Sequence, residues 1–226
     1  DESIEREGNI GNNFLPRVPE IQKVFDDPVV VGALTSLLGG DYTMNPHRHA
    51  HLNPAGTGGG GWHKDCYVWD HNLRHPRFHW VLALYYPHDV TEDMGPTAVL
   101  PGKQYYERIS SDNPSQCEEE EMPLCGSAGT VALVHFDAWH RATSSTSEKK
   151  RYMLKFQFTR LREPSVPSWN HVAPDWGPVG EDSEIWKDVW GWLCGHTGKN
   201  GAGRFPEKEE EISAYLDVFR GGTEAE

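Results

Sequence analysis

The sequence predicts an all-β core with flanking helices, and three observations support that prediction. Short apolar stretches of strand length recur between about residues 41 and 162, and turns rich in Gly and Pro separate them. Several stretches alternate apolar and polar residues, which places the apolar side chains on one face of a strand. Candidate metal ligands gather at the ends of these stretches. Together these features predict a jelly roll, the double-stranded β-helix, with a metal at its mouth.

The N-terminal helical segment is expected over residues 18–39. Apolar residues recur there at roughly helical spacing. Pro28 should divide the segment into two pieces, because proline cannot donate a helical hydrogen bond. Gly39 and Gly40 should end it.

The β core follows, over about residues 41–162. Its expected strands are 41–53, 78–86, 97–100, 129–136 and 151–161. The second is apolar on both faces, as in a strand within a sandwich core, whereas the last alternates strongly. We expect this order of strands to surround one hydrophobic core.

A C-terminal helical extension is expected over residues 163–226. A proline-rich stretch comes first, and capped apolar patterns then predict helices at 182–194 and 206–220. The whole chain of 226 residues suits a single domain. The chain begins without Met or a signal peptide, and 221–226 resembles the start of a further helix, so we expect a fragment of a longer protein with another helical module after it.

Composition narrows the class of partner. The net charge of −13 argues against nucleic acid or an anionic membrane as the main partner and leaves a small molecule as the expected one. The sequence contains no run of 18 apolar residues, so no membrane span is expected. The four cysteines have no CxxC spacing, so reduced thiols and a cytoplasmic location are expected.

The most informative motif is His63-Lys64-Asp65, with His140 far downstream. On a strand, residues i and i+2 face the same way, so His63 and Asp65 can present an imidazole and a carboxylate side by side. A distant histidine then completes a cluster of two histidines and one carboxylate. This set is the facial triad of non-haem Fe(II) oxygenases, and it leaves positions open for a cosubstrate and O2.

Arg151 adds a carboxylate-binding group to this cluster. It lies eleven positions after His140 and opens the strongly alternating stretch 151–161. A guanidinium is planar and suits bidentate capture of a carboxylate. Ligands at strand ends, followed by an arginine on the next strand, predict an oxygenase that uses an acidic cosubstrate.

These residues resemble the phytanoyl-CoA dioxygenase family of Fe(II)/2-oxoglutarate oxygenases, from about residue 41 to residue 161. The resemblance includes His63-Lys-Asp65, Trp80, the segment His135-Phe-Asp-Ala-Trp-His140 and the spacing to Arg151. Its most specific part is Gly-Pro-Thr-Ala-Val-Leu-Pro-Gly at 95–102, because nothing in the metal chemistry requires that stretch.

The resemblance implies a role for each of these positions. His63, Asp65 and His140 would bind Fe(II), Arg151 would hold the far carboxylate of 2-oxoglutarate, and Trp80 would flank the 2-oxoglutarate pocket. The implied reaction consumes O2, releases succinate and CO2, and hydroxylates a small organic substrate. Asp65, where a halogenase would have Gly or Ala, favours hydroxylation.

One position departs from the pattern of some family members. They have Ser two residues after the distal histidine as a further cosubstrate contact, whereas this chain has Ala142. Thr143 and Ser144 are the neighbouring hydroxyls that could take its place.

The substrate contacts are less well defined. Arg74 and Arg77 lie in 71–79, the only locally basic stretch near the motif, and would attract an anionic substrate if this stretch covers the metal. An ordinary surface loop is the other interpretation. His51 is a further candidate for substrate contact.

Two other function classes stay open. His47, His49 and His51 alternate on one expected strand and could bind a metal as in a cupin-type isomerase or a metal-dependent binding protein. A non-catalytic barrel that serves as a scaffold is the other possibility, although every ligand type of the triad is intact.

Overall fold

The structure is a computed structural model that describes residues 15–16, 18–65, 80–102, 104 and 120–162. The helices are the 3-10 helix η1 (Pro19–Ile21), α2 (Gln22–Phe25) and α3 (Pro28–Leu38). The strands are β1 (Tyr42–Asn53), β2 (Trp80–Tyr85), β3 (Thr97–Val99), β4 (Met122–Pro123), β5 (Val131–His135), β6 (His140–Ala142) and β7 (Arg151–Arg160). The helices expected within 163–226 and the basic stretch 71–79 lie outside the described residues.

The expected break at Pro28 is confirmed, and its cause is local. Pro28 is the first residue of α3, and the carboxylate of Asp27 caps the helix by accepting a hydrogen bond from the Val29 N–H at 2.9 Å. Proline is tolerated there because the first N–H groups of a helix have no partner within it. Gly39, with φ of 81°, ends the helix as predicted.

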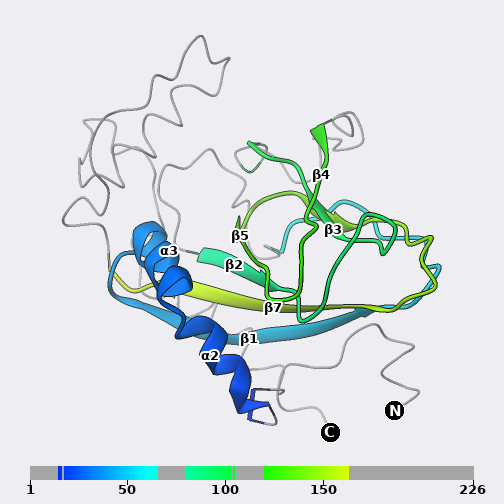
Figure 1. The fold of residues 1–226 in the computed structure, drawn as a ribbon. Coiled ribbons are helices and arrows are strands. Elements are labelled where there is room, and N and C mark those ends of the chain that lie inside the picture. The colour runs from blue at the N-terminus through cyan, green and yellow to red at the C-terminus, as the bar shows by residue number, and fades with distance from the viewer. Residues whose placement is uncertain (1–14, 17, 66–79, 103, 105–119, 163–226) are drawn as a thin grey trace, which may run out of the picture.

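The strands form two antiparallel sheets. The larger sheet has the order β1-β7-β2-β5, and the smaller has the order β4-β3-β6 (Figure 1). The expected strands are present within one to two residues at most ends. The short strands β4 and β6 were not expected, because each is too brief to show a period in the sequence.

β1 contains an irregularity that preserves its alternation. Met44 pairs with Phe158 and Arg48 pairs with Phe156, so residues 45–47 of β1 lie opposite residue 157 alone. β1 thus has two extra residues at this point, and an even number leaves the two faces of the strand unchanged. His49 consequently faces the same side as its partner Lys155.

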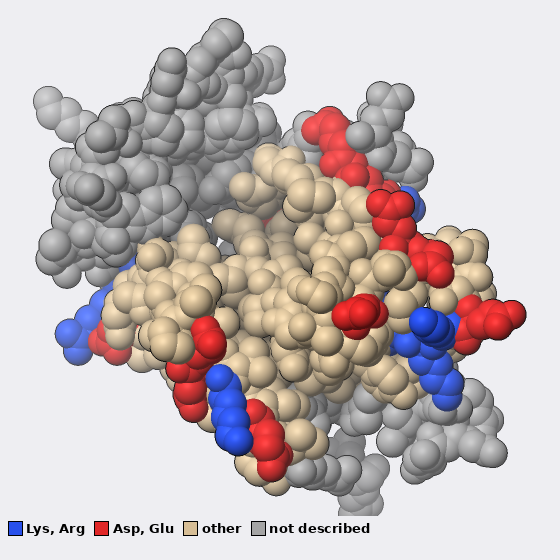
Figure 2. All heavy atoms as spheres, viewed as in Figure 1, with Lys and Arg blue, Asp and Glu red and all other residues tan. Residues whose placement is uncertain are grey.

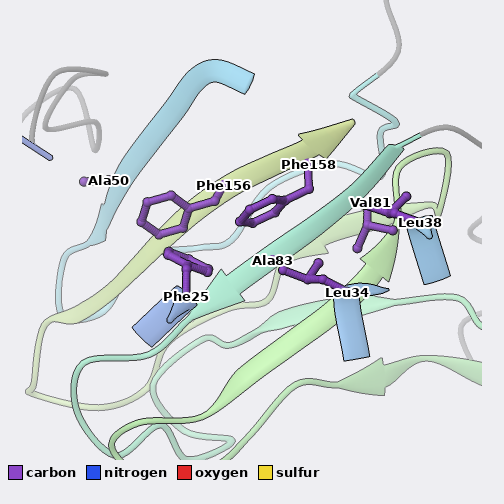
Figure 3. Close-up of a cluster of buried hydrophobic side chains, with 8 residues drawn as sticks. All are labelled: Phe25, Leu34, Leu38, Ala50, Val81, Ala83, Phe156 and Phe158. Atoms are coloured by element: carbon purple, nitrogen blue, oxygen red, sulfur yellow. The ribbon is translucent and has the colours of Figure 1, made fainter. Parts of the chain in front are cut away.

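Helices α2 and α3 cover one face of the larger sheet (Figures 1 and 3). The ring of Phe25 lies 4.4 Å from the ring of Phe156 and 5.2 Å from that of Phe158, measured between centroids. The other buried members of this cluster are Leu34, Leu38, Ala50, Val81 and Ala83. Each such large side chain contributes about 1.5–3 kcal/mol when fully buried, so this cluster fixes the helices on the sheet.

The opposite face of the larger sheet is called the inner face below. It contains a second apolar cluster, whose buried members are Leu82, Leu84, Tyr86, Val90, Phe136 and Met153. Strand pairing also places His49, His51 and Asn53 of β1 on this face, beside Lys155, Met153 and Arg151 of β7. The inner face therefore combines an apolar floor with a short row of polar and cationic groups.

No helix in the described part of the chain is long and apolar enough to cross a membrane. On the face shown in Figure 2, the described basic side chains are isolated and lie next to acidic ones.

Candidate metal centre

Three potential ligands meet where the two sheets approach each other. One ligand atom from each of His63, Asp65 and His140 lies within 4.8 Å of the others, and the described residues contain no other such group. The backbones of His63 and His140 exchange two hydrogen bonds of 3.0 Å, which fix the two segments side by side. Their rings are 4.3 Å apart between centroids.

Backbone carbonyls determine which nitrogen of each histidine is free. Nδ1 of His63 lies 3.0 Å from the Gly61 carbonyl, and Nδ1 of His140 lies 2.9 Å from the Ala138 carbonyl. A carbonyl oxygen only accepts hydrogen bonds, so in each neutral ring Nδ1 bears the proton. The lone pair is then on Nε2, the nitrogen available to a metal.

The charge states also suit a metal. Burial lowers the pKa of His140 to about 4, against a smaller opposing effect of Asp65, so this imidazole is neutral near pH 7. Burial alone would raise the pKa of Asp65, but Lys155, His140 and His63 outweigh burial and the pKa falls to about 2. Asp65 is therefore a carboxylate and His140 a neutral nitrogen donor, the forms that bind a divalent cation.

Lys155 provides a direct test of the fit, because its ammonium already lies against the carboxylate. Nζ of Lys155 donates to Oδ1 of Asp65 at 3.1 Å and to Oδ2 at 2.9 Å. Nε2 of His140 is 3.7 Å from the same Oδ2. The place where a metal ion would meet Asp65 thus accommodates a positive charge, and the donor set is one that Fe(II) accepts.

Arg151 lies on the same inner face, almost fully buried at 1% exposure. Its Nε donates to the Gly95 carbonyl at 3.0 Å, while its buried Nη1 has no hydrogen-bond partner among the described residues. A guanidinium stays charged even where burial lowers its pKa, as here. A buried cation with an unused donor suits an incoming carboxylate.

The Gly-Pro-Thr stretch has a structural purpose in this arrangement. The Gly95 carbonyl accepts the hydrogen bond from Arg151 and a second one of 3.2 Å from Nδ2 of Asn53. Gly95 has φ of 67°, and a Cβ there would lie 2.7 Å from the carbonyl oxygen of Thr143. Only glycine lets the chain pass close enough to orient Arg151 in this way.

Trp80 does not lie beside Arg151. It pairs with Thr159, eight residues from Arg151 along β7, which is on the order of 26 Å at about 3.3 Å per residue. Its ring packs 5.7 Å from that of Phe136. Tyr86 is the aromatic residue near Arg151: burial raises the pKa of Tyr86, and the guanidinium partly opposes that rise.

His49 and His51 of β1 lie on the inner face without forming a second metal cluster in the described part of the chain. The rings of His49 and His51 stack at 5.7 Å. Burial, followed by the charge of Lys155, lowers the pKa of His51 to about 3, so this ring is neutral beside the cations. The side chain of His47 lies outside the described residues, as do Arg74 and Arg77.

The hydroxyls that follow Ala142 contact backbone. Thr143 Oγ1 donates to the Pro96 carbonyl and Ser144 Oγ donates to the Gly58 carbonyl, each at 2.9 Å. They therefore fix the glycine-rich segment before His63 and the segment around Gly95 in position next to the metal ligands.

Sequence reasoning overlooked three residues of the site. Lys155 was visible as a residue four positions after Arg151 in an alternating strand, which places both on one face. Asn53, the last residue of β1, and Tyr86, the residue after β2, gave no signal in the sequence, since each has its role only through the pairing of distant segments.

Comparison with known proteins identifies the family. Residues 3–153, two thirds of the chain, match the model of the phytanoyl-CoA dioxygenase family. The chain belongs to the phytanoyl-CoA dioxygenase family. Uncharacterized proteins of Mycobacterium tuberculosis and Mycobacterium bovis are each 33% identical over 70 residues, which is 31% of this chain. The match spans only 25% of the length of those relatives.

Solved structures of the same fold confirm the expected jelly roll. EctD from S. alaskensis with bound Fe has a TM-score of 0.54 at 17% identity, over 65% of this family member and 55% of that chain. EctD with 2-oxoglutarate and 5-hydroxyectoine has a TM-score of 0.55 at 18% identity, over 66% and 55%. EvdMO1 has a TM-score of 0.50 at 13% identity, over 62% and 32%. At these identities the likeness concerns the fold alone.

Proposed function

We propose that this chain is an Fe(II)/2-oxoglutarate-dependent dioxygenase that hydroxylates a small organic substrate and releases succinate and CO2. The observation that carries the proposal is the triad of His63, Asp65 and His140 with both Nε2 atoms available. Membership of the phytanoyl-CoA dioxygenase family supports it. EctD, which has been solved with Fe and with 2-oxoglutarate, supports the same cofactor and cosubstrate.

In this proposal the triad, Arg151 and the apolar floor of the inner face each have a defined task. His63, Asp65 and His140 hold Fe(II), which when bound supplies the activation of O2. Arg151 binds the far carboxylate of 2-oxoglutarate through its unused Nη1, with its own orientation fixed by the Gly95 carbonyl. The apolar floor excludes water and strengthens these charge interactions.

The substrate residues are part of the proposal. His51, the candidate substrate contact, lies on the inner face. Trp80, predicted to flank the 2-oxoglutarate pocket, lies on the same face and pairs with Thr159, at the end of β7 away from Arg151. Arg74 and Arg77 would attract an anionic substrate from the stretch after Asp65. Replacing both with Ala should then weaken substrate turnover and its salt dependence while uncoupled 2-oxoglutarate decay persists.

The test measures metal binding and succinate release separately. His63→Ala, Asp65→Ala and His140→Ala should each abolish tight Fe(II) or Co(II) binding in equilibrium titrations, with the far-UV circular dichroism retained. His49→Ala is the matched control, because it removes an inner-face imidazole outside the triad. Release of succinate from 2-oxoglutarate, with Fe(II) and ascorbate present, should require all three ligands.

Two outcomes would favour the other function classes. Loss of the metal in His49→Ala, with the triad variants unaffected, would support a cupin-type site on β1. A wild-type chain that binds neither Fe(II) nor 2-oxoglutarate would support a non-catalytic barrel.

A further inference from the structure

Lys155 is the inner-face group whose position the proposed function does not yet explain. Lys155 is buried at 8% exposure, and its ammonium contacts both oxygens of Asp65, the only carboxylate of the proposed triad. The other lysine near the ligands, Lys64, has different partners: its Nζ donates to the Gln104 carbonyl and lies over the Trp139 ring. Lys155 therefore competes with a metal for Asp65.

A divalent ion on Asp65 would leave Lys155 with unused hydrogen-bonding capacity. An ammonium has three donors, and at most one oxygen of the carboxylate remains for it once the other binds a metal. A divalent cation and an ammonium beside one buried carboxylate also leave an excess of positive charge, which is costly in a water-poor place. An anion that arrives together with the metal would remove both problems.

Strand geometry indicates where that anion lies. Lys155 and Arg151 are four residues apart on β7, so both face inward with Cα atoms about 13 Å apart. Both side chains are long, and the Arg151 guanidinium and Lys155 ammonium can approach from the two ends a molecule that bears carboxylates several ångströms apart. Lys155 is at the triad itself, and Arg151 is held by the Gly95 carbonyl four residues away along β7.

We propose that Lys155 is a second carboxylate anchor of the active site, which pairs with Asp65 in the metal-free protein and binds the carboxylate next to the keto group of 2-oxoglutarate in the loaded protein. The proposal rests on the proposed function. It assigns to β7 both ends of the cosubstrate: Arg151 the far carboxylate, and Lys155 the carboxylate beside the metal. Lys155 also delays metal binding until it gives up Asp65.

The experiment compares two acids on protein loaded with Co(II) or Mn(II) in the absence of O2. 2-Oxoglutarate has both carboxylates, whereas 2-oxopentanoate has only the one beside the keto group. Lys155→Gln should weaken binding of both acids by about tenfold or more, the value of a charge-assisted hydrogen bond. Arg151→Ala should weaken binding of 2-oxoglutarate and leave that of 2-oxopentanoate nearly unchanged.

A second measurement, of metal affinity without either acid, should change in the opposite direction. Without a competing ammonium, Lys155→Gln should bind Co(II) more tightly than the wild type in a titration with metal alone, again by about tenfold. If Lys155 served only to stabilise the fold, its replacement would not strengthen Co(II) binding while weakening the binding of both acids. Lys149→Gln is the matched control, since Lys149 is an exposed lysine in the turn before β7.

Lys155→Arg distinguishes loss of the cation from a folding defect in Lys155→Gln. It keeps a cation at this place, and it should retain most of the affinity for 2-oxopentanoate that Lys155→Gln loses. Equal binding of both acids to wild type and Lys155→Gln would overturn the proposal and would indicate that Lys155 serves an acidic substrate instead. A wild-type protein that binds no metal or 2-oxoglutarate would contradict the proposed function itself, which is a distinguishable result.

Discussion

Arg151 shows how a single residue combines burial with an unused donor. Its Nε is held by the Gly95 carbonyl while Nη1 is buried without a described partner. A buried polar group without a partner costs about 1–3 kcal/mol, and more when it is charged. The folded chain therefore bears a cost at this position that a bound carboxylate would offset.

This leads to a prediction for Arg151 variants. Arg151→Ala should raise the dissociation constant for 2-oxoglutarate by about ten- to a hundredfold, because a charge-assisted pair contributes about 1.5–3 kcal/mol. Arg151→Lys should restore only part of the affinity, because an ammonium lacks the planar fork. Titration calorimetry on Co(II)-loaded protein measures both. Co(II) affinity should change little, and unchanged 2-oxoglutarate affinity in Arg151→Ala would place the anchor elsewhere, at Arg141 or Lys155.

At the scale of elements, the segment before β3 supports the strand that carries Arg151. Gly95 lies where the chain passes close to residues 143–145, and its carbonyl accepts from both Asn53 of β1 and Arg151 of β7. One backbone oxygen thus connects three segments that are distant in the sequence. Its position should control both stability and cosubstrate binding.

Gly95→Ala tests this connection, with Gly56→Ala as control. Both glycines have positive φ, 67° and 68°, but a Cβ at Gly56 would meet nothing within 4 Å, whereas one at Gly95 would meet the Thr143 carbonyl oxygen at 2.7 Å. Backbone strain alone should cost about 1 kcal/mol at Gly56, and Gly95→Ala should cost about 2–4 kcal/mol because the clash adds to it. Urea unfolding measures the difference. Equal losses in the two variants would mean that the close approach is unimportant.

The elements also show what the sequence could and could not predict. The alternation of 151–161 and the break at Pro28 depend on neighbouring residues, so strand β7 and helix α3 were predictable. His63 and Asp65 were predictable as a pair because they are two positions apart, whereas His140 was predicted from its spacing to Arg151 in the family resemblance. The pair of Lys155 with Asp65 joins residues 90 positions apart, and no local period encodes which lysine reaches which carboxylate. The short strands β4 and β6 form only because β3 lies between them.

At the scale of the whole molecule, the interior contains several histidines that burial keeps neutral. Burial is the main cause that lowers the pKa of His51 to about 3 and those of His135 and His140 to about 4. In the unfolded chain a histidine titrates near pH 6.5. Between these values the unfolded chain binds protons that the folded chain does not, so acid favours unfolding.

The free energy of unfolding should therefore fall as the pH is lowered from about 6.5 to about 4. Each of the three buried histidines should contribute on the order of 1–2 kcal/mol to the loss at about pH 5. Urea unfolding of metal-free protein at about pH 7 and about pH 5 measures the sum. A divalent metal should steepen the dependence, because protons then compete with it for His140. Burial raises the pKa of Asp137 to about 7, so this carboxyl opposes the loss, and the contribution of the imidazoles is the part of the slope that His51→Gln and His135→Gln remove. An unchanged slope in these variants would show that the imidazoles are not held neutral.

The irregularity in β1 has a consequence for how the length of this strand can vary. Residues 45–47 lie opposite a single residue of β7, so the strand has gained a pair of residues and kept its parity. Gain or loss of one residue there would move every following side chain of β1 to the other face of the sheet. His49, His51 and Asn53 would then face helices α2 and α3, and Arg48 and Leu52 would face the metal side. An insertion or deletion of two residues in this stretch would therefore keep His49, His51 and Asn53 on the inner face, whereas one of a single residue would move them to the opposite face.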